Sequence, residues 1–258
     1  MGAKASRSVP SARLLGADPE LVEGLVAAGG RAPLRAEVPV IDVPPGPWSP
    51  AGLVSHHARA FALLVSTGLV VRELLLADCT ATELLGAGDL VEVRPALDAL
   101  VPTATRWIVA EPARIAILDD RMLGLLAGHP ELATRLLARS AHQAARLAAQ
   151  RAISQLPRVE DRLLALFGHL AERWGRVGGA GIIVPLRLTH ETLGRLVGAR
   201  RPTVSLALKQ LAAAGAVVRR PDGSWLLRPE ALDALAPPGD GHRPRLAARV
   251  VDPGRARR

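Results

Sequence analysis

Residues 188–218 read LTHETLGRLVGARRPTVSLALKQLAAAGAVV, and this stretch predicts two short helices joined by a tight turn. The first helix begins after Thr189, whose hydroxyl can accept a hydrogen bond from a backbone N–H of the first turn. It ends at Gly198, because glycine adopts the positive φ that reverses a chain after a helix. The second helix has Pro202 in its first turn and ends at Gly215. Two helices joined by so short a turn predict a helix-turn-helix.

The residues after the second helix predict a small β-hairpin, or wing. Residues 216–220 are a β-type run, and residues 225–227 are the returning strand. The Pro-Asp-Gly-Ser segment between them predicts a tight turn, because an Asp-Gly pair tolerates the positive φ that such turns need. Before the two helices, a further helix is predicted from Pro157 to about Trp174, followed by a loop over 175–181. We therefore predict a winged helix-turn-helix domain over residues 156–236.

A helix-turn-helix of this kind can bind DNA. Its second helix enters the major groove with its N-terminal end, while the first helix crosses the DNA backbone. Arg201 is therefore the best candidate to bind guanine O6 and N7, a contact worth about 1–3 kcal/mol of discrimination. A helical hairpin in a protein-binding module is the alternative, and the spacing, the wing and the local charge argue against it. The other predicted contacts to bases or phosphates are Thr189, His190, Arg200, Thr203, Ser205, Lys209, Arg219 and Arg220.

The positive charge of the chain is concentrated in its C-terminal part. The 258 residues carry a net charge of +9. Residues 1–155 hold 15 basic and 15 acidic side chains, whereas residues 156–258 hold 18 basic and 9 acidic side chains. All of the excess therefore lies in the part that contains the predicted helix-turn-helix. This asymmetry indicates a polyanion as the partner of that domain, and we expect double-stranded DNA.

The stretch quoted above resembles the DNA-binding domain of the Crp–Fnr family of transcription regulators, named after the cyclic-AMP receptor protein and the fumarate–nitrate regulator. In that family, an arginine at the position of Arg201 reads a guanine. Pro202 stands where a glutamate usually contacts a cytosine, and Leu206 stands where a second base-contacting arginine is common. The resemblance implies a transcription regulator that meets RNA polymerase, with an altered half-site and a methyl contact from Leu206. The motifs that carry it are Leu-Thr at 188–189, Leu-Val-Gly at 196–198 and Arg-x-Thr-Val-Ser at 201–205.

The N-terminal half of the chain predicts a small all-β domain. Residues 39–50 are rich in Pro and Gly, which suits turns and edge strands. Residues 61–76 form two apolar runs around Ser66-Thr67-Gly68, a pattern that predicts a hairpin or two short buried strands. Several short strands with turns between them indicate a β-sandwich or barrel. The remaining predicted elements are strands over 80–85, 106–110 and 114–118 and a turn over 85–90.

A long helix is predicted over residues 131–155. Such a helix is about 37 Å long, which is longer than a small barrel needs to cover itself. Its spare apolar, Ala-rich face indicates pairing with the same helix of a second subunit, and packing within one chain is the alternative. The Crp–Fnr resemblance extends more weakly to residues 64–70, 85–90 and 129–132. It implies a jelly-roll β-barrel of the cyclic-nucleotide-binding type.

The predicted fold class is therefore α+β. It combines an N-terminal β-barrel of the cyclic-nucleotide-binding type, a long dimerisation helix and a C-terminal winged helix-turn-helix. The predicted division of the chain is a lead (1–30), a sensor barrel (31–130), the dimerisation helix (131–155), the DNA-binding domain (156–236) and a disordered basic tail (237–258).

The sensor departs from the family's cyclic-nucleotide site. Members that bind a cyclic nucleotide follow the Gly-Asp turn with Phe-Gly-Glu, and later present an arginine before Ser/Thr-Ala to the cyclic phosphate. In this chain, no second glycine follows the Gly88-Asp89 turn, and no arginine precedes Thr103. Glu92 can serve as a ribose partner, but the phosphate anchor is missing. We therefore predict a degenerate effector pocket at these four residues that does not bind cyclic AMP or cyclic GMP; the sequence does not identify the effector.

No cofactor and no metal is predicted. Cys79 is the single cysteine, too few for an iron–sulfur cluster, and it fits a reducing cytoplasm. His56 and His57 are adjacent, so on an extended segment they point to opposite faces and are not expected to share an ion.

The chain is also not expected to be an enzyme or a membrane protein. It contains no Gly-rich phosphate loop, no His/Glu metal motif and no Gly-x-Ser-x-Gly elbow. It has no uninterrupted apolar run of about 18 residues, which argues against a membrane span. We expect a cytoplasmic homodimer that binds a palindromic operator. The alternative is a constitutive or partner-controlled DNA-binding protein whose barrel binds no ligand.

Overall fold

The computed structural model forms two compact units, Met1–Ala145 and Arg146–Arg258. The boundary between the units lies inside the long helix α6 (Pro130–Gln155), which the sequence predicts as a segment of its own. The residues whose structure is described are 11–13, 18, 21, 36–54, 59–92 and 100–235.

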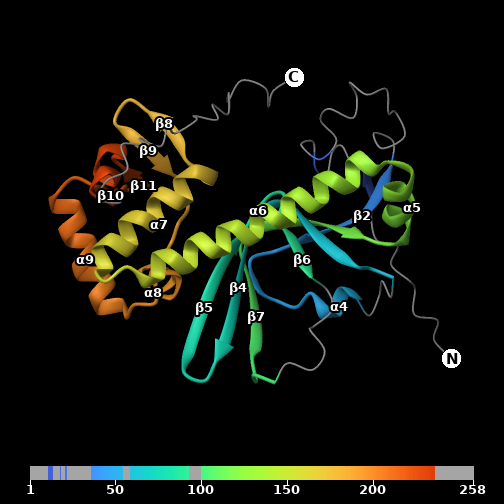
Figure 1. Cartoon of the computed structure of the whole chain (residues 1–258), viewed down its shortest axis with the longest axis horizontal. Coiled ribbons are helices and arrows are strands. Elements are labelled where there is room, and N and C mark those ends of the chain that lie inside the picture. The colour runs from blue at the N-terminus through green and yellow to red at the C-terminus, as the bar shows by residue number, and fades with distance from the viewer. Residues whose placement is uncertain are drawn as a thin grey trace. The chain divides into compact units, whose positions relative to one another are not determined.

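An antiparallel sheet forms the N-terminal unit. Its two longest strands, β4 (Ala62–Leu76) and β7 (Ala104–Leu118), lie side by side (Figure 1). The start of β4 and the end of β7 alternate between side chains of two apolar clusters, so both faces of the sheet are covered there. The described strands follow the order β1-β2-β7-β4-β5, with β3 on β7 and β6 on β4. Their bounds are β1 (Ser11–Arg13), β2 (Glu37–Val43), β3 (Gly46–Trp48), β5 (Cys79–Leu85) and β6 (Leu90–Glu92).

Residues 61–76 do not form the predicted hairpin, because Ala62–Leu76 is one strand. The Ser-Thr-Gly segment at 66–68 is a β-bulge, at which the pairing register with β7 shifts. Gly68 has a φ of +90°, and a Cβ on it would lie 2.2 Å from the carbonyl oxygen of Pro112. The two short strands predicted within 106–118 are likewise one strand, β7. Glycine and proline signals mark a bulge as well as a turn, and only the long-range pairing distinguishes the two.

Part of the predicted flexible lead belongs to the folded unit. Strand β1 pairs with β2, and Leu21 is fully buried in a core cluster with residues of β2, β4, β7 and the helices. The Asp18 carboxylate accepts a hydrogen bond from the Leu21 N–H at 3.0 Å. The same carboxylate pairs with Arg139, whose Nη2 donates to Asp18 Oδ1 at 2.8 Å. Contacts this distant along the chain leave no periodic signal in the sequence. The predicted tail, 237–258, lies outside the described residues.

The helices of the N-terminal unit begin with the short α4 (Ala51–Val54) and α5 (Asp120–Gly128). The long helix α6 then starts at Pro130 and ends at Gln155, where the sequence predicts a helix over 131–155. Leu132 and Leu136 of α6 are buried in the same cluster as Leu21, against β2, β4 and β7. The first turns of α6 are therefore held on the sheet by apolar burial.

The C-terminal unit packs its helices on a small antiparallel sheet of order β10-β11-β9-β8. Phe167 and Trp225 meet in its core, with ring centroids 5.0 Å apart. Both side chains are almost fully buried, so this pair contributes a large share of the apolar burial of the unit. Its elements are α7 (Val159–Trp174), β8 (Arg176–Gly178), β9 (Gly181–Val184), α8 (His190–Val197), α9 (Arg201–Ala213), β10 (Val217–Arg219), β11 (Trp225–Leu227) and a 3₁₀ helix (Pro229–Leu235).

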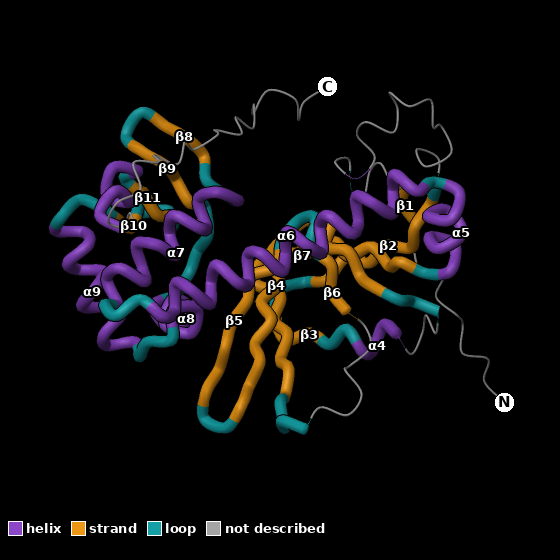
Figure 2. The backbone as a smooth tube through the Cα atoms, viewed as in Figure 1, coloured by secondary structure: helices purple, strands orange, loops and turns teal. Residues whose placement is uncertain are grey.

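The helix-turn-helix and the wing form at the predicted residues, but two other details of this unit differ from the prediction. Helix α7 begins at Val159 after the N-cap Arg158, and Pro157 precedes it. The segment 175–181, predicted as a loop, contributes the hairpin β8–β9 (Figure 2). Strands of three and four residues are too short for a pattern of alternating burial, so the sequence does not distinguish them from a loop.

Candidate nucleic-acid interface

Helix α8 has a side-chain cap at its start and a glycine at its end, and an arginine contacts the turn that leads to α9. The Thr189 hydroxyl accepts a hydrogen bond from the Thr192 N–H at 3.1 Å, as the sequence predicts. Gly198 ends α8 in the left-handed conformation, with a φ of +65°. Arg162 of α7 donates from Nη1 to the carbonyl oxygen of Val197 at 3.3 Å. Sequence reasoning missed this arginine, because its contact joins two elements that are far apart in the chain.

Replacing Thr189 with Ala is expected to lower the free energy of unfolding of the C-terminal unit by about 1 kcal/mol, because one N–H of the first turn loses its acceptor. Urea unfolding followed by tryptophan fluorescence measures this change, since Trp174 and Trp225 lie in the unit. Thr189→Ser keeps the hydroxyl and is the matched control, with an expected midpoint close to that of the unsubstituted protein. Equal midpoints for the Ala and Ser variants would contradict the capping role.

Helix α9 has a buried face and an exposed face. Val204, Leu208 and Leu211 are buried in the unit. Leu206 lies on the opposite side, with 59% of its surface exposed. The predicted contact residues that are exposed here are Arg200, Arg201, Thr203, Leu206 and Lys209.

Two of the predicted contacts bond to each other and are not fully exposed. Nδ1 of His190, at the start of α8, lies 2.9 Å from Oγ of Ser205 on α9. The Ser205 hydroxyl also donates to the carbonyl oxygen of Arg201 at 3.0 Å. Both side chains are half-buried, whereas the sequence pattern places Ser205 on the outward side of the helix. Burial lowers the pKa of His190, and the guanidinium groups of Arg219 and Arg201 lower it further.

The wing carries the two remaining predicted contacts. Arg219 is exposed and its guanidinium lies 5.7 Å from the ring centroid of Trp225. Arg220 is half-buried, 3.8 Å from the carboxylate of Asp222. That carboxylate accepts hydrogen bonds from the side chain and the backbone of Ser224, which hold the pKa of Asp222 below its usual value. The turn is therefore ordered by its own side chains, with both arginines at its base.

The four residues of the predicted effector pocket do not lie together. Gly88 and Asp89 form the turn between β5 and β6, where the buried Asp89 carboxylate accepts from the Gly86 N–H at 2.9 Å. Glu92 lies opposite Ala62, near the start of β4. Thr103 directly precedes Ala104, which lies opposite Leu75 at the other end of that strand. Two ends of a strand this long are separated by roughly 40 Å, so Thr103 cannot complete a small-molecule site with the other three.

Helix α6 contacts the turn that carries Gly88 and Asp89. The Gln143 side-chain amide donates to the carbonyl oxygen of Leu90 and accepts from its N–H, both at 3.2 Å. It also donates to Oε1 of Glu83 at 3.2 Å. Burial raises the pKa of Glu83, and the nearby Arg72 opposes that rise. A Cβ on Gly88 would lie 3.4 Å from Nη1 of Arg139. Side chains of this chain's own helix thus fill the surroundings of the turn.

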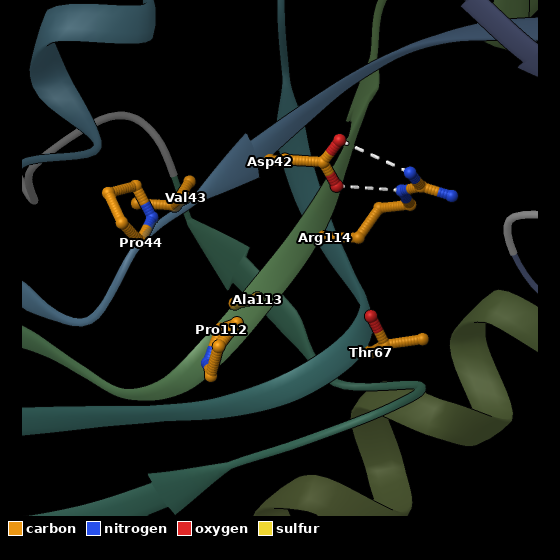
Figure 3. Close-up of a pocket in the computed structure, with 7 residues that line it drawn as sticks. All are labelled: Asp42, Val43, Pro44, Thr67, Pro112, Ala113 and Arg114. Carbon is orange, nitrogen blue, oxygen red and sulfur yellow. Dashed lines mark hydrogen bonds and ion pairs between the residues drawn. The ribbon is translucent and has the colours of Figure 1, made fainter.

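A cavity of about 410 Å³ lies elsewhere on the barrel, beside the bulge of β4 (Figure 3). Arg114 and Asp42 form an exposed ion pair at its edge, with Nε and Nη2 at 2.8 and 3.2 Å from the carboxylate oxygens. The hydrogen bond from Arg114 lowers the pKa of Asp42. None of the four predicted effector residues lines this cavity. Its lining residues are Asp42, Val43, Pro44, Thr67, Pro112, Ala113 and Arg114.

Of the other residues singled out in the sequence, the structure describes Cys79. Cys79 is exposed at the start of β5, and His56 and His57 lie outside the described residues. Within the described ranges, no three His, Cys, Asp or Glu side chains gather where they could hold a metal ion. The described helices also include none with both the length and the apolarity that a membrane crossing needs.

Comparison with known proteins identifies the C-terminal unit. Residues 157–235 match the family described as the Crp-like helix-turn-helix domain. Regulatory protein CysR of Synechococcus elongatus is 35% identical over 83 residues, which are 31% of this chain. This match spans 40% of the length of CysR. The family match therefore lies in the unit that carries α8, α9 and the wing.

Solved structures extend the similarity of the fold to the barrel. A mutant of CooA from Carboxydothermus hydrogenoformans is 19% identical, with a TM-score of 0.61 over 77% of this chain and 87% of the other. A protein from Listeria monocytogenes with a cyclic nucleotide-binding domain is 15% identical, with a TM-score of 0.60 over 74% of this chain and 89% of the other. The predicted fold class, α+β with a barrel of this type and a C-terminal winged helix-turn-helix, is confirmed.

Proposed function

Because this chain belongs to the Crp–Fnr family of transcription regulators, we propose that it binds a palindromic operator as a homodimer and that cyclic AMP does not control it. The observation that carries the proposal is the exposed face of α9, where Arg200, Arg201 and Lys209 stand beside Thr203 and Leu206. In a Crp-like domain, this face enters the major groove. It offers cationic donors for phosphates and for guanine, and an apolar group for a thymine methyl.

The readout divides among these side chains by their position. Arg201 is at the first turn of α9 and reads guanine, because its two N–H groups match O6 and N7. Arg200, Lys209 and the wing arginines bind phosphates, and Thr189 does so at the N-terminus of α8. Leu206 contacts a methyl group. The operator therefore differs from one that is read by two arginines in each half-site.

Selection of bound duplexes from random DNA tests this proposal. We expect an enriched sequence with two-fold symmetry and half-sites about one helical turn apart, because each protomer presents one α9 to the major groove. Enrichment of a single half-site without a symmetric partner would overturn the homodimer, and no enrichment at all would overturn sequence-specific binding.

Dimerisation through α6 is supported by its exposed face. Leu137, Ala141, Ala144 and Ala148 follow at intervals of three and four residues, and so lie along one side of the helix. Leu137 is 71% exposed and the three alanines are exposed as well. Small side chains let a second helix approach closely, and the burial of Leu137 stabilises the pair. Contact with RNA polymerase and location in the cytoplasm stay predictions.

Cyclic AMP and cyclic GMP are expected to produce no saturable heat in titration calorimetry. The phosphate of either nucleotide needs an arginine or a set of N–H groups. Here Asp89 uses its buried carboxylate within its own turn, and Thr103 lies at the far end of β4. Micromolar binding of either nucleotide would contradict this part of the proposal.

A second candidate function is DNA binding that no small molecule controls. The contacts of Gln143 with Leu90 and Glu83 favour it, because they already join the helix to the turn of the barrel. In this case a protein partner or the amount of the regulator sets its activity. The test compares the operator affinity of protein purified from cells with that of protein refolded from denaturant. Equal affinities support this candidate. A lower affinity after refolding that a small-molecule extract restores supports an effector.

A further inference from the structure

His190 and Ser205 link the two helices of the interface in a way that the proposed function does not use. We propose that His190, oriented by Ser205, is a proton-dependent phosphate contact, so that the protein takes up a proton at this imidazole when it binds DNA. The inference rests on the proposed DNA binding. It assigns His190 a regulatory role, and it assigns Ser205 a positioning role in place of the base contact that the sequence predicts.

The hydrogen bonds decide which ring nitrogen titrates. The Ser205 hydroxyl donates its one proton to the carbonyl oxygen of Arg201, an i to i−4 bond within α9. Its oxygen is then left to accept, and we assign the donor role to Nδ1 of His190, 2.9 Å away. The neutral ring therefore carries its proton on Nδ1, and its lone pair is on Nε2. Protonation adds the second proton at Nε2 and leaves the bond to Ser205 intact.

The charged groups around His190 come from three elements. Arg201 belongs to α9 and Arg219 to β10, and both oppose a positive charge on the ring. Glu191 follows His190 on α8, but its carboxylate is engaged by Nη2 of Arg195 at 2.5 Å. The free protein therefore holds His190 in its neutral form at neutral pH, with two cations close by.

DNA reverses this electrostatic balance. The phosphates of the duplex, including those that bind Arg219, offset the repulsion that Arg219 and Arg201 exert on His190, so the pKa of the ring rises in the complex. A group with a higher pKa in the bound state binds a proton on association, and affinity then increases as the pH falls through the two values. A rise of one unit in this pKa corresponds to about tenfold tighter binding for each protomer at pH values below the pKa of the free and of the bound protein. Well above both values, affinity is independent of this group.

The test is calorimetry of operator binding at pH 6 in buffers of different ionisation enthalpy, with the full-length protein and the selected duplex. We expect proton uptake by the unsubstituted protein and none by His190→Asn. The asparagine keeps an N–H near the position of Nδ1 but cannot titrate, so its operator affinity is expected to change less between pH 6 and pH 8 than that of the unsubstituted protein. His142→Asn is the matched control, since His142 is exposed on α6, and it is expected to retain the uptake.

Ser205→Ala tests the positioning role. It is expected to weaken operator binding about three- to tenfold at pH 6, because the protonated imidazole loses the hydrogen-bond partner that orients it. Combined with His190→Asn, it is expected to add little further loss, since the two side chains act as one unit. Thermal unfolding of each variant shows whether the unit is still folded. A proton NMR titration of His190, free and bound, gives its pKa in both states without any substitution.

The outcomes separate this inference from the function on which it rests. Operator binding with no proton uptake, or with equal uptake by His190→Asn, overturns the inference and leaves the proposed function standing. An NMR pKa that does not rise on binding also overturns it. A protein that enriches no duplex at any pH overturns both.

Discussion

Arg201→Ala is expected to weaken binding to the operator about ten- to a hundredfold for each half-site and to remove the preference at one base pair. The side chain is exposed at the N-terminal end of α9, the part of the helix that meets base edges. Neither Pro202 nor Leu206 can replace its paired donors, because neither side chain has an N–H or O–H group. Competition among four duplexes that differ at this base pair measures the effect.

Lys209→Ala is the contrasting variant on the same helix. Lys209 is exposed, and an ammonium group that binds a phosphate carries no base information. Its loss is expected to weaken all duplexes equally and to reduce the salt dependence of binding by about one counterion per protomer. If Arg201→Ala shows the same uniform loss, Arg201 binds a phosphate and the direct readout assigned to it is wrong.

Ala148→Glu is expected to convert the dimer into a monomer and to reduce operator affinity about 100-fold or more, because one protomer then binds one half-site alone. Ala148 lies on the exposed side of α6 with Leu137, Ala141 and Ala144. In the proposed dimer, a glutamate there would meet its own copy across the two-fold axis, so two carboxylates would be buried without partners. Light scattering gives the mass, and titration of a two-half-site duplex gives the affinity.

The matched control is Ala149→Glu. Ala149 is also exposed on α6, but one residue further along the helix it is rotated by about 100° from Ala148. The added charge is the same, and helix propensity changes equally. The control is expected to remain a dimer with unchanged affinity. Dimers formed equally by both variants would show that the partner helix packs on another surface.

The helix-turn-helix was predictable because its signals are local. The Thr189 cap, the positive φ of Gly198 and the Asp-Gly turn of the wing each depend on a few neighbouring residues. The bulge at Gly68 was not, because the same Ser-Thr-Gly segment suits a turn and a bulge, and the pairing of β4 with β7 decides between them. The burial of Leu21 against the sheet depends on contacts with residues more than a hundred positions away.

The residues of the candidate site also divide into those that local patterns predict and those that distant contacts place. Helical periodicity places Arg201, Thr203 and Lys209 on the exposed face of α9, and the structure agrees. Ser205 follows the same periodicity, but its hydroxyl turns toward His190 on the other helix, a contact that no spacing within α9 encodes. Thr103 entered the predicted effector pocket through a family motif. The pairing of the next residue, Ala104, with Leu75 removes it, and this pairing is a property of the folded sheet.

The most direct test of the central claim is dimethyl sulfate footprinting of the selected operator, since this reagent methylates guanine N7 in the major groove. If Arg201 of each protomer binds O6 and N7, one guanine in each half-site is protected, and the two protections are symmetric about the centre. Both are expected to disappear with Arg201→Ala and to persist with Lys209→Ala at a concentration that keeps the duplex bound. Binding without guanine protection, or protection that survives in Arg201→Ala, would contradict the placement of α9 in the major groove with Arg201 as its reader.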